Sequence, residues 1–145
     1  NDTQRSIRAY EIKTFTKKSL VEWHKGTKSI FERNDFFKIY IDFPRQELIN
    51  RINKRTELMI KEGAIKEINR FMKLNVKGDH SSNKVIGVSE IRQFLDKKLN
   101  LDELKELISI KTRQYAKRQS TWARGKMQDW NKIDPKDLNK FLKKI

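Results

Sequence analysis

The sequence predicts a mainly α-helical fold with one or two short strands. Apolar residues recur at helical spacing along most of the chain, and residues that begin or end helices separate these stretches. Only residues 37–43 alternate as a half-buried strand does. The 145 residues are 36% hydrophobic, which suffices for one modest core, so we expect a single domain over residues 1–145.

Two helical segments are expected at the start of the chain. The first covers residues 3–17, with Asp2 or Thr3 as its cap, because both residue types accept hydrogen bonds from a first helical turn. A short helical turn around residues 21–23 follows, and Gly26 ends it.

The strand pattern lies in FKIYIDF, residues 37–43, where Ile39, Ile41 and Phe43 alternate with other side chains. Residues 128–134 are compatible with a second short strand. Since a two-stranded sheet alone is marginal and an unpaired edge invites association, we expect FKIYIDF to belong to a sheet supplied from elsewhere.

The middle of the chain predicts two helices, over residues 45–62 and 64–74, separated by Gly63. The first carries an apolar stripe formed by Leu48, Ile52 and Met59. Residues 76–83 are polar and rich in turn-forming types, which predicts an exposed, flexible loop.

Three more helices are expected after the loop. Ser89 is the predicted cap of a helix that runs to Leu99, and Pro135 is predicted to open a last basic helix. The longest helix is expected to begin at Asp102 and to end at Gly125. One face of it should pack, through Leu101, Leu104, Ile108, Tyr115 and Trp122.

The charge of the chain restricts its partners. Thirty-four Lys and Arg against 19 Asp and Glu give a net charge of +15, which favours a polyanion such as nucleic acid or an anionic membrane. The chain has no cysteine, and its two histidines, His24 and His80, are far apart, which argues against zinc sites and cysteine catalysis. No apolar run is long enough for a membrane span, so we expect a cytoplasmic protein without a membrane partner.

The strongest binding signal is KTRQYAKRQSTWARGK, residues 111–126, with six positive charges and no acid. On a helix, Arg113, Lys117 and Arg124 share one stripe, roughly opposite the expected packing face. A solvated charged face is the plain explanation. The interleaved Gln114, Gln119, Ser120 and Thr121 favour RNA recognition, because they add groups that can bond base edges to the phosphate anchors.

Weaker signals lie outside this stretch. Arg5 and Arg8 share a helix face with Gln4 beside them, which is compatible with a second phosphate-contacting patch. The three tryptophans suggest base stacking, but each follows an apolar pattern, and core packing is the stronger expectation. Only Trp122 stays a stacking candidate.

Arg55 stands out because it follows Leu48 by seven residues and so falls inside the apolar stripe. A buried guanidinium requires an anion. Either the side chain reaches solvent or pairs with an acid such as Glu57 or Glu62, or it grips a phosphate or diphosphate.

The run TRQYAKRQSTWAR, residues 112–124, resembles the signature near the end of the tRNA dimethylallyltransferase family, also called tRNA isopentenyltransferases. Three further stretches resemble the family in the expected order: NDTQRSIRAYE from Asn1, RINKRTELMIKEGAIKEI from Arg51 and VIGVSEIRQFL from Val85. The chain departs from the family at Val88, where a tyrosine is usual, and at Ala123, where a bulkier apolar residue is usual.

The resemblance implies an activity and partners. The family transfers a dimethylallyl group from dimethylallyl diphosphate to the exocyclic amine of the adenosine 3′-adjacent to the anticodon, a base that is flipped to be reached. Mg²⁺ assists departure of the diphosphate in the complete enzyme, and we expect its ligands outside this chain. The expected macromolecular partner is the tRNA anticodon stem-loop.

The resemblance also implies site residues. Arg55 matches an arginine that faces the substrate diphosphate. Together with the basic face, the matching stretches give this expected tRNA-binding set: Gln4, Arg5, Arg8, Lys84, Arg113, Lys117, Arg118, Gln119, Thr121, Trp122 and Arg124.

The first half of the family pattern is missing from this sequence. No P-loop, catalytic aspartate or G-G-T-G-type loop is found, so we expect no catalytic residue in this chain. The expected fold is thus the carboxyl-terminal part of an α/β P-loop-type fold whose parallel sheet is largely missing. We expect the chain alone to be inactive and a separate P-loop half to be a candidate partner that completes it. The alternative is a non-catalytic RNA-binding module.

Overall fold

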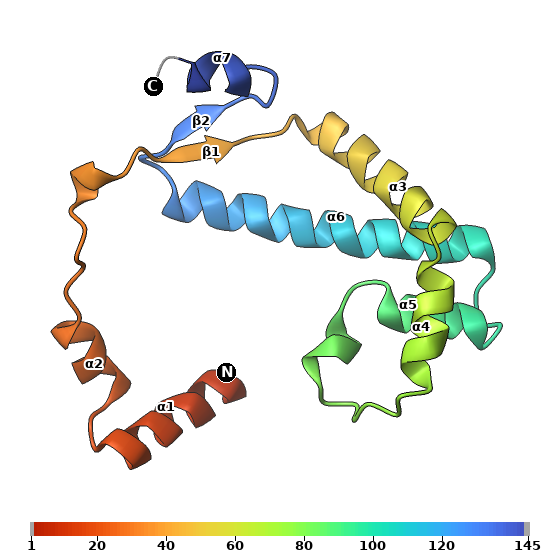
Figure 1. Ribbon diagram of the computed structural model, residues 1–145, viewed down its shortest axis with the longest axis horizontal. Coiled ribbons are helices and arrows are strands. Elements are labelled where there is room, and N and C mark those ends of the chain that lie inside the picture. Colours follow the sequence, from red (N-terminus) through yellow and green to blue (C-terminus); the bar gives the residue numbers. More distant parts are fainter. Residues whose placement is uncertain (1, 144–145) are drawn as a thin grey trace. The chain divides into compact units, whose positions relative to one another are not determined.

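The computed structural model describes residues 2–143, except the side chain of Arg33. The chain is mostly helical and contains one two-stranded parallel sheet (Figure 1), which confirms the expected fold class. It divides into two compact units, Asn1–Phe37 and Lys38–Ile145. No helix of the described residues is long and apolar enough to cross a membrane.

The first unit contains α1 (Thr3–Thr16), α2 (Leu20–Gly26) and a 3₁₀ turn, η1 (Arg33–Asp35). Asp2 caps α1 by accepting a hydrogen bond from the Arg5 backbone at 3.2 Å. Both helices were expected, with these starts and ends within a residue or two. Neither helix contains a buried residue.

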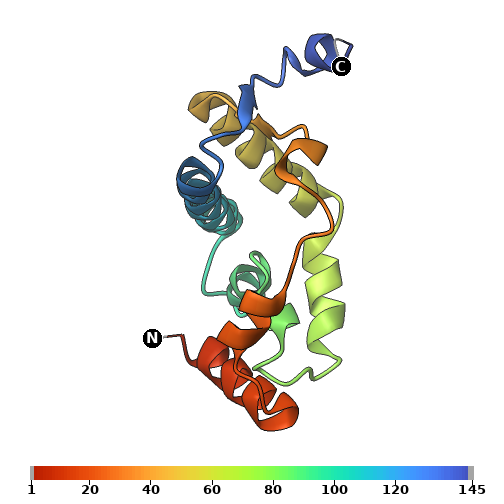
Figure 2. The same cartoon turned by 90° about the vertical axis from the view of Figure 1, so that its left-hand side faces the viewer.

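The second unit holds the core and both strands. Its elements are, in chain order, β1 (Ile39–Ile41), α3 (Arg45–Lys61), α4 (Ala64–Met72), η2 (Ser81–Lys84), α5 (Val88–Leu95), α6 (Leu101–Lys126), β2 (Asn131–Ile133) and α7 (Leu138–Leu142). Helix α6 contacts α3 and α5, and α4 contacts α3 and α5, so the four helices form one group (Figures 1 and 2).

The core of this unit lies where α5 meets the first half of α6. Ile91, Leu104 and Ile108 are buried there, and they are joined by half-buried apolar residues of α3, α4 and α5. Burial of these side chains is the main force that holds the four helices together. The core therefore anchors the first half of α6. The second half lies beside β1 and α3 instead.

Strand β1 pairs in parallel with β2, with Ile39 opposite Asn131 and Ile41 opposite Ile133. Strand β2 lies within residues 128–134 and confirms the second short strand expected there. That FKIYIDF belongs to a larger sheet supplied from elsewhere stays a prediction. The expected alternation of β1 fails at Ile41, which is 40% exposed. No third strand among the described residues covers either edge of this sheet.

Two predicted helix starts are corrected by the structure. Helix α6 is capped by Asn100, whose side chain accepts from Asp102 N and Glu103 N at 3.0 and 2.9 Å, and Asp102 lies inside the helix. Helix α5 begins after Gly87, not at Ser89. Gly87 has φ +105°, a conformation that glycine adopts without strain.

Several predicted ends and faces also differ. Helix α6 continues through Gly125 to Lys126, α5 ends at Leu95, and α7 begins three residues after Pro135. The loop expected over residues 76–83 contains the start of η2. The predicted packing face of α6 is confirmed at Leu104 and Ile108 but is wrong at Leu101, Tyr115 and Trp122, which are 41%, 50% and 58% exposed.

Candidate nucleic-acid interface

The second half of α6 lies beside β1 and the start of α3. Small side chains of α6, Ala116 and Ser120, line the same space as Phe43 and Leu48. Ala123 is only 4% exposed. Small side chains let the neighbouring elements approach this part of the helix, so the polar and aromatic residues of α6 flank the junction with β1 and α3.

A cleft of about 780 Å³ opens on one side of this junction, and we call it the Lys117 cleft. Three of its cations come from α6 and one from the start of α3: Arg113, Lys117, Arg124 and Arg45. Its floor is apolar and includes Ile49 and Ile52. The stripe predicted from the sequence, Arg113 with Lys117 and Arg124, thus lines one cleft.

A second hollow of about 560 Å³ lies on the other side of the same junction, and we call it the Trp122 groove. Arg118, Gln119 and Trp122 line it from α6, together with Ile41 of β1 and Met127, which follows α6. The structure therefore divides the predicted RNA-binding residues of α6 between two hollows that share one wall.

The cations of residues 111–126 fall into two groups. Arg113 Nη2 is 2.7 Å from Glu106 Oε1, and Lys111 is paired with the buried carboxylate of Glu90. Among the described residues, the side chains of Lys117, Arg118, Arg124 and Lys126 form no ion pair. These four carry the charge that remains available to an anion, and Lys117, Arg118 and Arg124 are the ones that line the two hollows.

An exposed aromatic stripe accompanies the unpaired cations. Tyr115 and Trp122 are seven residues apart on α6 and half-exposed, and the Arg118 guanidinium lies 5.7 Å from the centre of the Tyr115 ring. A guanidinium over an aromatic ring is held by cation–π attraction. Thr121 donates its hydroxyl proton to the Lys117 carbonyl at 3.0 Å. Aromatic rings exposed beside cations can stack on unpaired bases.

Arg55 does not lie where the sequence analysis placed it. The residues of α3 that are buried are Ile52 and Thr56, and Arg55 is exposed at the rim of this face. Thr56 Oγ1 accepts a hydrogen bond from Ser109 Oγ of α6 at 3.2 Å. Thr56 thus occupies the buried position in which Arg55 was expected. Arg55 forms no ion pair with any other described residue, and the expected internal partners Glu57 and Glu62 are not used.

The remaining predicted residues are exposed and lie apart from α6 in the sequence. Gln4, Arg5 and Arg8 belong to α1, in the first unit. Arg5 pairs with Asp2 at 3.0 Å and Arg8 with Glu11 at 3.1 Å. Lys84 ends η2. The structure thus brings together the α6 residues of the predicted set but supplies no placement of α1 beside them.

Sequence reasoning missed Glu90, whose side chain is 1% exposed at the start of α5. It accepts hydrogen bonds from Gly87 N at 2.7 Å, from Ser89 Oγ at 2.6 Å and from Lys111 Nζ. Burial raises the pKa of this carboxyl, but the three donors outweigh burial and hold the pKa below its ordinary value of 4.5. A glutamate three residues after a helix cap is a recognisable signal for such a capping contact.

No group of three His, Cys, Asp or Glu residues within residues 2–143 is arranged to hold a metal ion. The ligands of the Mg²⁺ that the family resemblance implies are expected outside this chain, and no step is assigned to that ion here.

Comparison with known proteins decides the family. A protein-family model described as IPP transferase matches residues 1–126, most of the chain. The chain belongs to this family. The tRNA dimethylallyltransferase of Pelagibacter ubique (strain HTCC1062) is 54% identical over the whole chain, which covers 46% of that protein. The tRNA dimethylallyltransferase of Rickettsia felis is 37% identical over 97% of the chain and 46% of its own length.

Solved structures of the family have the same fold. The tRNA isopentenylpyrophosphate transferase of Bacillus halodurans matches with a TM-score of 0.63 and 32% identity over 79% of this chain and 36% of its own. A second such enzyme, from Staphylococcus epidermidis, matches with a TM-score of 0.63 and 30% identity over 92% of this chain and 43% of its own. The chain spans less than half the length of these family members.

Proposed function

We propose that this chain supplies tRNA contacts for prenyl transfer, in the cytoplasm. The reaction is transfer of a dimethylallyl group from dimethylallyl diphosphate to the N6 amine of the adenosine 3′-adjacent to the anticodon. Family membership supports the reaction class. The observation that carries the RNA-binding role is that unpaired Lys117 and Arg124 line one hollow beside α6, while unpaired Arg118 and exposed Trp122 line the adjoining one.

The two hollows take different parts of an anticodon stem-loop in this proposal. Lys117 and Arg124 meet backbone phosphates at the Lys117 cleft, because both are exposed and without an acidic partner among the described residues. Trp122 and Tyr115 offer ring faces to bases that leave the stack, and Arg118 extends that surface. Gln119 beside Trp122 can bond base edges.

Arg113 and the α1 residues have secondary parts in the proposal. Arg113 lines the Lys117 cleft but is neutralised by Glu106, so its main effect is on the shape of the cleft. Arg5 and Arg8 are exposed but paired with acids, and Gln4 lies beside them. They would reach RNA only by exchanging those pairs for phosphates.

Arg55 remains the proposed contact for the substrate diphosphate. Its guanidinium is exposed on α3 and unpaired among the described residues, so an anionic ligand can bind it without first breaking an internal pair. Because Arg55 lines neither hollow beside α6, its loss should spare RNA binding.

The catalytic groups are proposed to belong to sequence that this chain does not contain. The 145 residues hold no P-loop motif, and the described part has no metal-binding cluster. We therefore propose that the chain alone does not transfer the prenyl group and that a P-loop-containing half, with its Mg²⁺ ligands, completes the enzyme.

The RNA-binding role is tested with a labelled tRNA anticodon stem-loop titrated with the chain at several salt concentrations. We expect the affinity to fall steeply with salt, since phosphate binding releases counterions. Arg118→Ala and Arg124→Ala should each weaken binding by about 1–3 kcal/mol if they make specific contacts.

Lys66→Ala on α4 is the matched control, because Lys66 is exposed and basic but lies outside both hollows beside α6. Equal affinity of all variants would remove α6 from the RNA interface. RNA binding without any support of transfer in a completed enzyme would favour the alternative, a non-catalytic RNA-binding module.

A further inference from the structure

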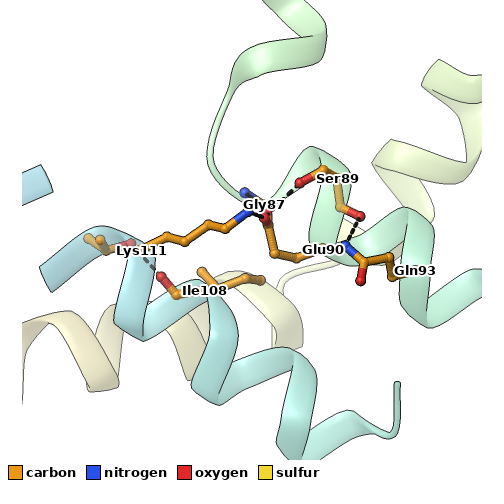
Figure 3. A network of polar contacts seen from close by, with 7 residues as sticks. Gly87, Ser89, Glu90, Gln93, Ile108 and Lys111 are labelled. Carbon is orange, nitrogen blue, oxygen red and sulfur yellow. Dashed lines mark hydrogen bonds and ion pairs between the residues drawn. The ribbon is translucent and has the colours of Figure 1, made fainter. Parts of the chain in front are cut away.

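The buried carboxylate of Glu90 joins two segments that both belong to the proposed RNA surface. One of its oxygens, Oε2, accepts from Gly87 N at 2.7 Å, and Oε1 accepts from Lys111 of α6 and from Ser89. Figure 3 shows the Lys111 side chain reaching from α6 to the start of α5, where it meets Glu90 beside Gly87. The contact therefore connects the turn before α5 directly to α6.

A simple helix cap does not require this arrangement. A glutamate that caps α5 needs only the Gly87 amide, and such caps are usually exposed to water. Glu90 is instead 1% exposed, and burial of a carboxylate is costly unless cations and donors compensate it. Lys111 supplies the cation while its own side chain stays 42% exposed.

The other end of the same turn is also fixed. Asn83 of η2 accepts a hydrogen bond from Arg92 Nη2 of α5 at 2.6 Å, and it donates to the Lys77 carbonyl at 2.7 Å. Arg92 in addition lies over the Phe71 ring of α4, 5.8 Å from its centre. The segment that carries Lys84 is thus held between Asn83 and Gly87.

Helix α6 carries both Lys111 and the basic residues that follow it in the sequence. Lys111 and Arg124 belong to one uninterrupted helix, and their offset of 13 positions corresponds to about 20 Å along the axis at 1.5 Å per residue. The Lys111–Glu90 pair therefore links the turn that carries Lys84 to the same helix that carries the basic face.

We propose that Glu90 is a positioning residue that holds Lys84 in register with the basic face of α6, so that one RNA contacts both segments at once. The inference rests on the proposed RNA-binding function. Nothing in it requires Glu90 to touch RNA, because its carboxylate is enclosed by Gly87, Ser89 and Lys111.

The test measures whether the contribution of Lys84 depends on Glu90. Affinity for the anticodon stem-loop is measured for the full chain and for Lys84→Ala, each with Glu90 intact and with Glu90→Gln. With Glu90 intact, Lys84→Ala should weaken binding roughly fivefold or more, because a contact with the RNA is lost. With Glu90→Gln, the same substitution should change affinity by less than about twofold, because the two segments no longer bind one RNA together.

A second variant and a control separate positioning from stability. Lys111→Gln removes the partly exposed partner of the same ion pair. In this variant too, Lys84→Ala should no longer weaken RNA binding. Ser109→Ala removes another buried contact of α6, the 3.2 Å hydrogen bond to Thr56, without touching the turn before α5. In that background Lys84→Ala should keep its full effect, although α6 packing is weakened.

The outcomes distinguish this inference from the function on which it rests. If the unaltered chain does not bind the stem-loop, the proposed RNA-binding function fails. If it binds but Lys84→Ala has no effect, or has the same effect with Glu90→Gln and Lys111→Gln as without them, the positioning role is refuted while RNA binding stands. Circular dichroism confirms that each compared variant is folded.

Discussion

The guanidinium of Arg113 is held by Glu106, with 2.7 Å between Nη2 and Oε1, seven residues earlier on α6. The pair lies on the helix that carries the proposed RNA surface, and the Arg113 side chain is 32% exposed. Because its charge is neutralised locally, Arg113 differs from Lys117 and Arg124, which line the same cleft without an acidic partner in the described chain. Position in a basic stripe and availability to phosphate are separate properties.

This difference predicts unequal salt effects. Arg124→Ala should reduce the slope of log affinity against log salt by about 1, since one phosphate contact and its counterion are lost. Arg113→Ala should leave the slope almost unchanged. The charge of Arg113 is already balanced by Glu106, so its contact with RNA releases few counterions. Titration of the stem-loop at several salt concentrations gives both slopes. A loss of slope in Arg113→Ala that equals or exceeds the loss in Arg124→Ala would contradict the division of cations.

Trp122 should contribute by stacking rather than by its apolar area alone. We expect Trp122→Leu to weaken stem-loop binding by about 1–3 kcal/mol, the usual effect of losing one stacked base. Trp122→Phe, which keeps a ring face, should restore most of the affinity. Since Trp122 is 58% exposed, neither change should greatly lower the free energy of unfolding. Equal affinities of the Leu and Phe variants would remove base stacking from the account.

The stability of the second unit should depend on the ionisation of Glu90. The pKa of Glu90 lies below 4.5 in the folded chain, so the folded state favours the charged form more than the unfolded state does. Its contribution to the free energy of unfolding is therefore present above pH 4.5 and is lost as the pH falls through the lower folded value.

Urea unfolding of the unaltered chain and of Glu90→Gln, from neutral pH to below 4.5, measures this contribution. We expect the stability difference between the two proteins to shrink as the solution becomes more acidic. Glu106→Gln serves as the control, because Glu106 is 61% exposed and screened by water. A difference that does not change with pH would show that Glu90 acts through its shape alone.

The helical core should respond strongly to loss of its central side chain. Leu104 is fully buried, so Leu104→Ala should lower the free energy of unfolding by about 2–5 kcal/mol. Leu74→Ala, at a position that is 70% exposed, should change it by less than about 0.5 kcal/mol. Chemical denaturation gives both values, and similar losses at the two positions would refute the assigned core.

Local signals in the sequence predicted most helices because caps and glycines act on neighbouring residues. The Asp2 cap and the break at Gly63 are examples, and both are confirmed. Errors arose where two suitable residues compete, as Asn100 and Asp102 do, since only the former accepts from two amides of α6. Gly125 was expected to end α6, but the helix continues one residue beyond it.

Long-range features could not be predicted in this way. The pairing of β1 with β2 joins residues more than 90 positions apart, and no local pattern specifies such a partner. Arg55 shares the spacing of its apolar neighbours, but α3 turns Thr56 towards Ser109 instead. Trp122 has the spacing of a core residue, yet the small Ala123 next to it takes the buried position.

The central claim, that this chain supplies the RNA contacts of a tRNA prenyltransferase and lacks its catalytic groups, is tested most directly by a transfer assay. Labelled dimethylallyl diphosphate and tRNA are incubated with this chain alone and with this chain plus the P-loop half of the Pelagibacter ubique relative, which is 54% identical over this region. The account predicts labelled tRNA only from the mixture, and less of it with Arg55→Ala. Labelled tRNA from this chain alone would contradict the account, as would a mixture that binds tRNA but transfers nothing.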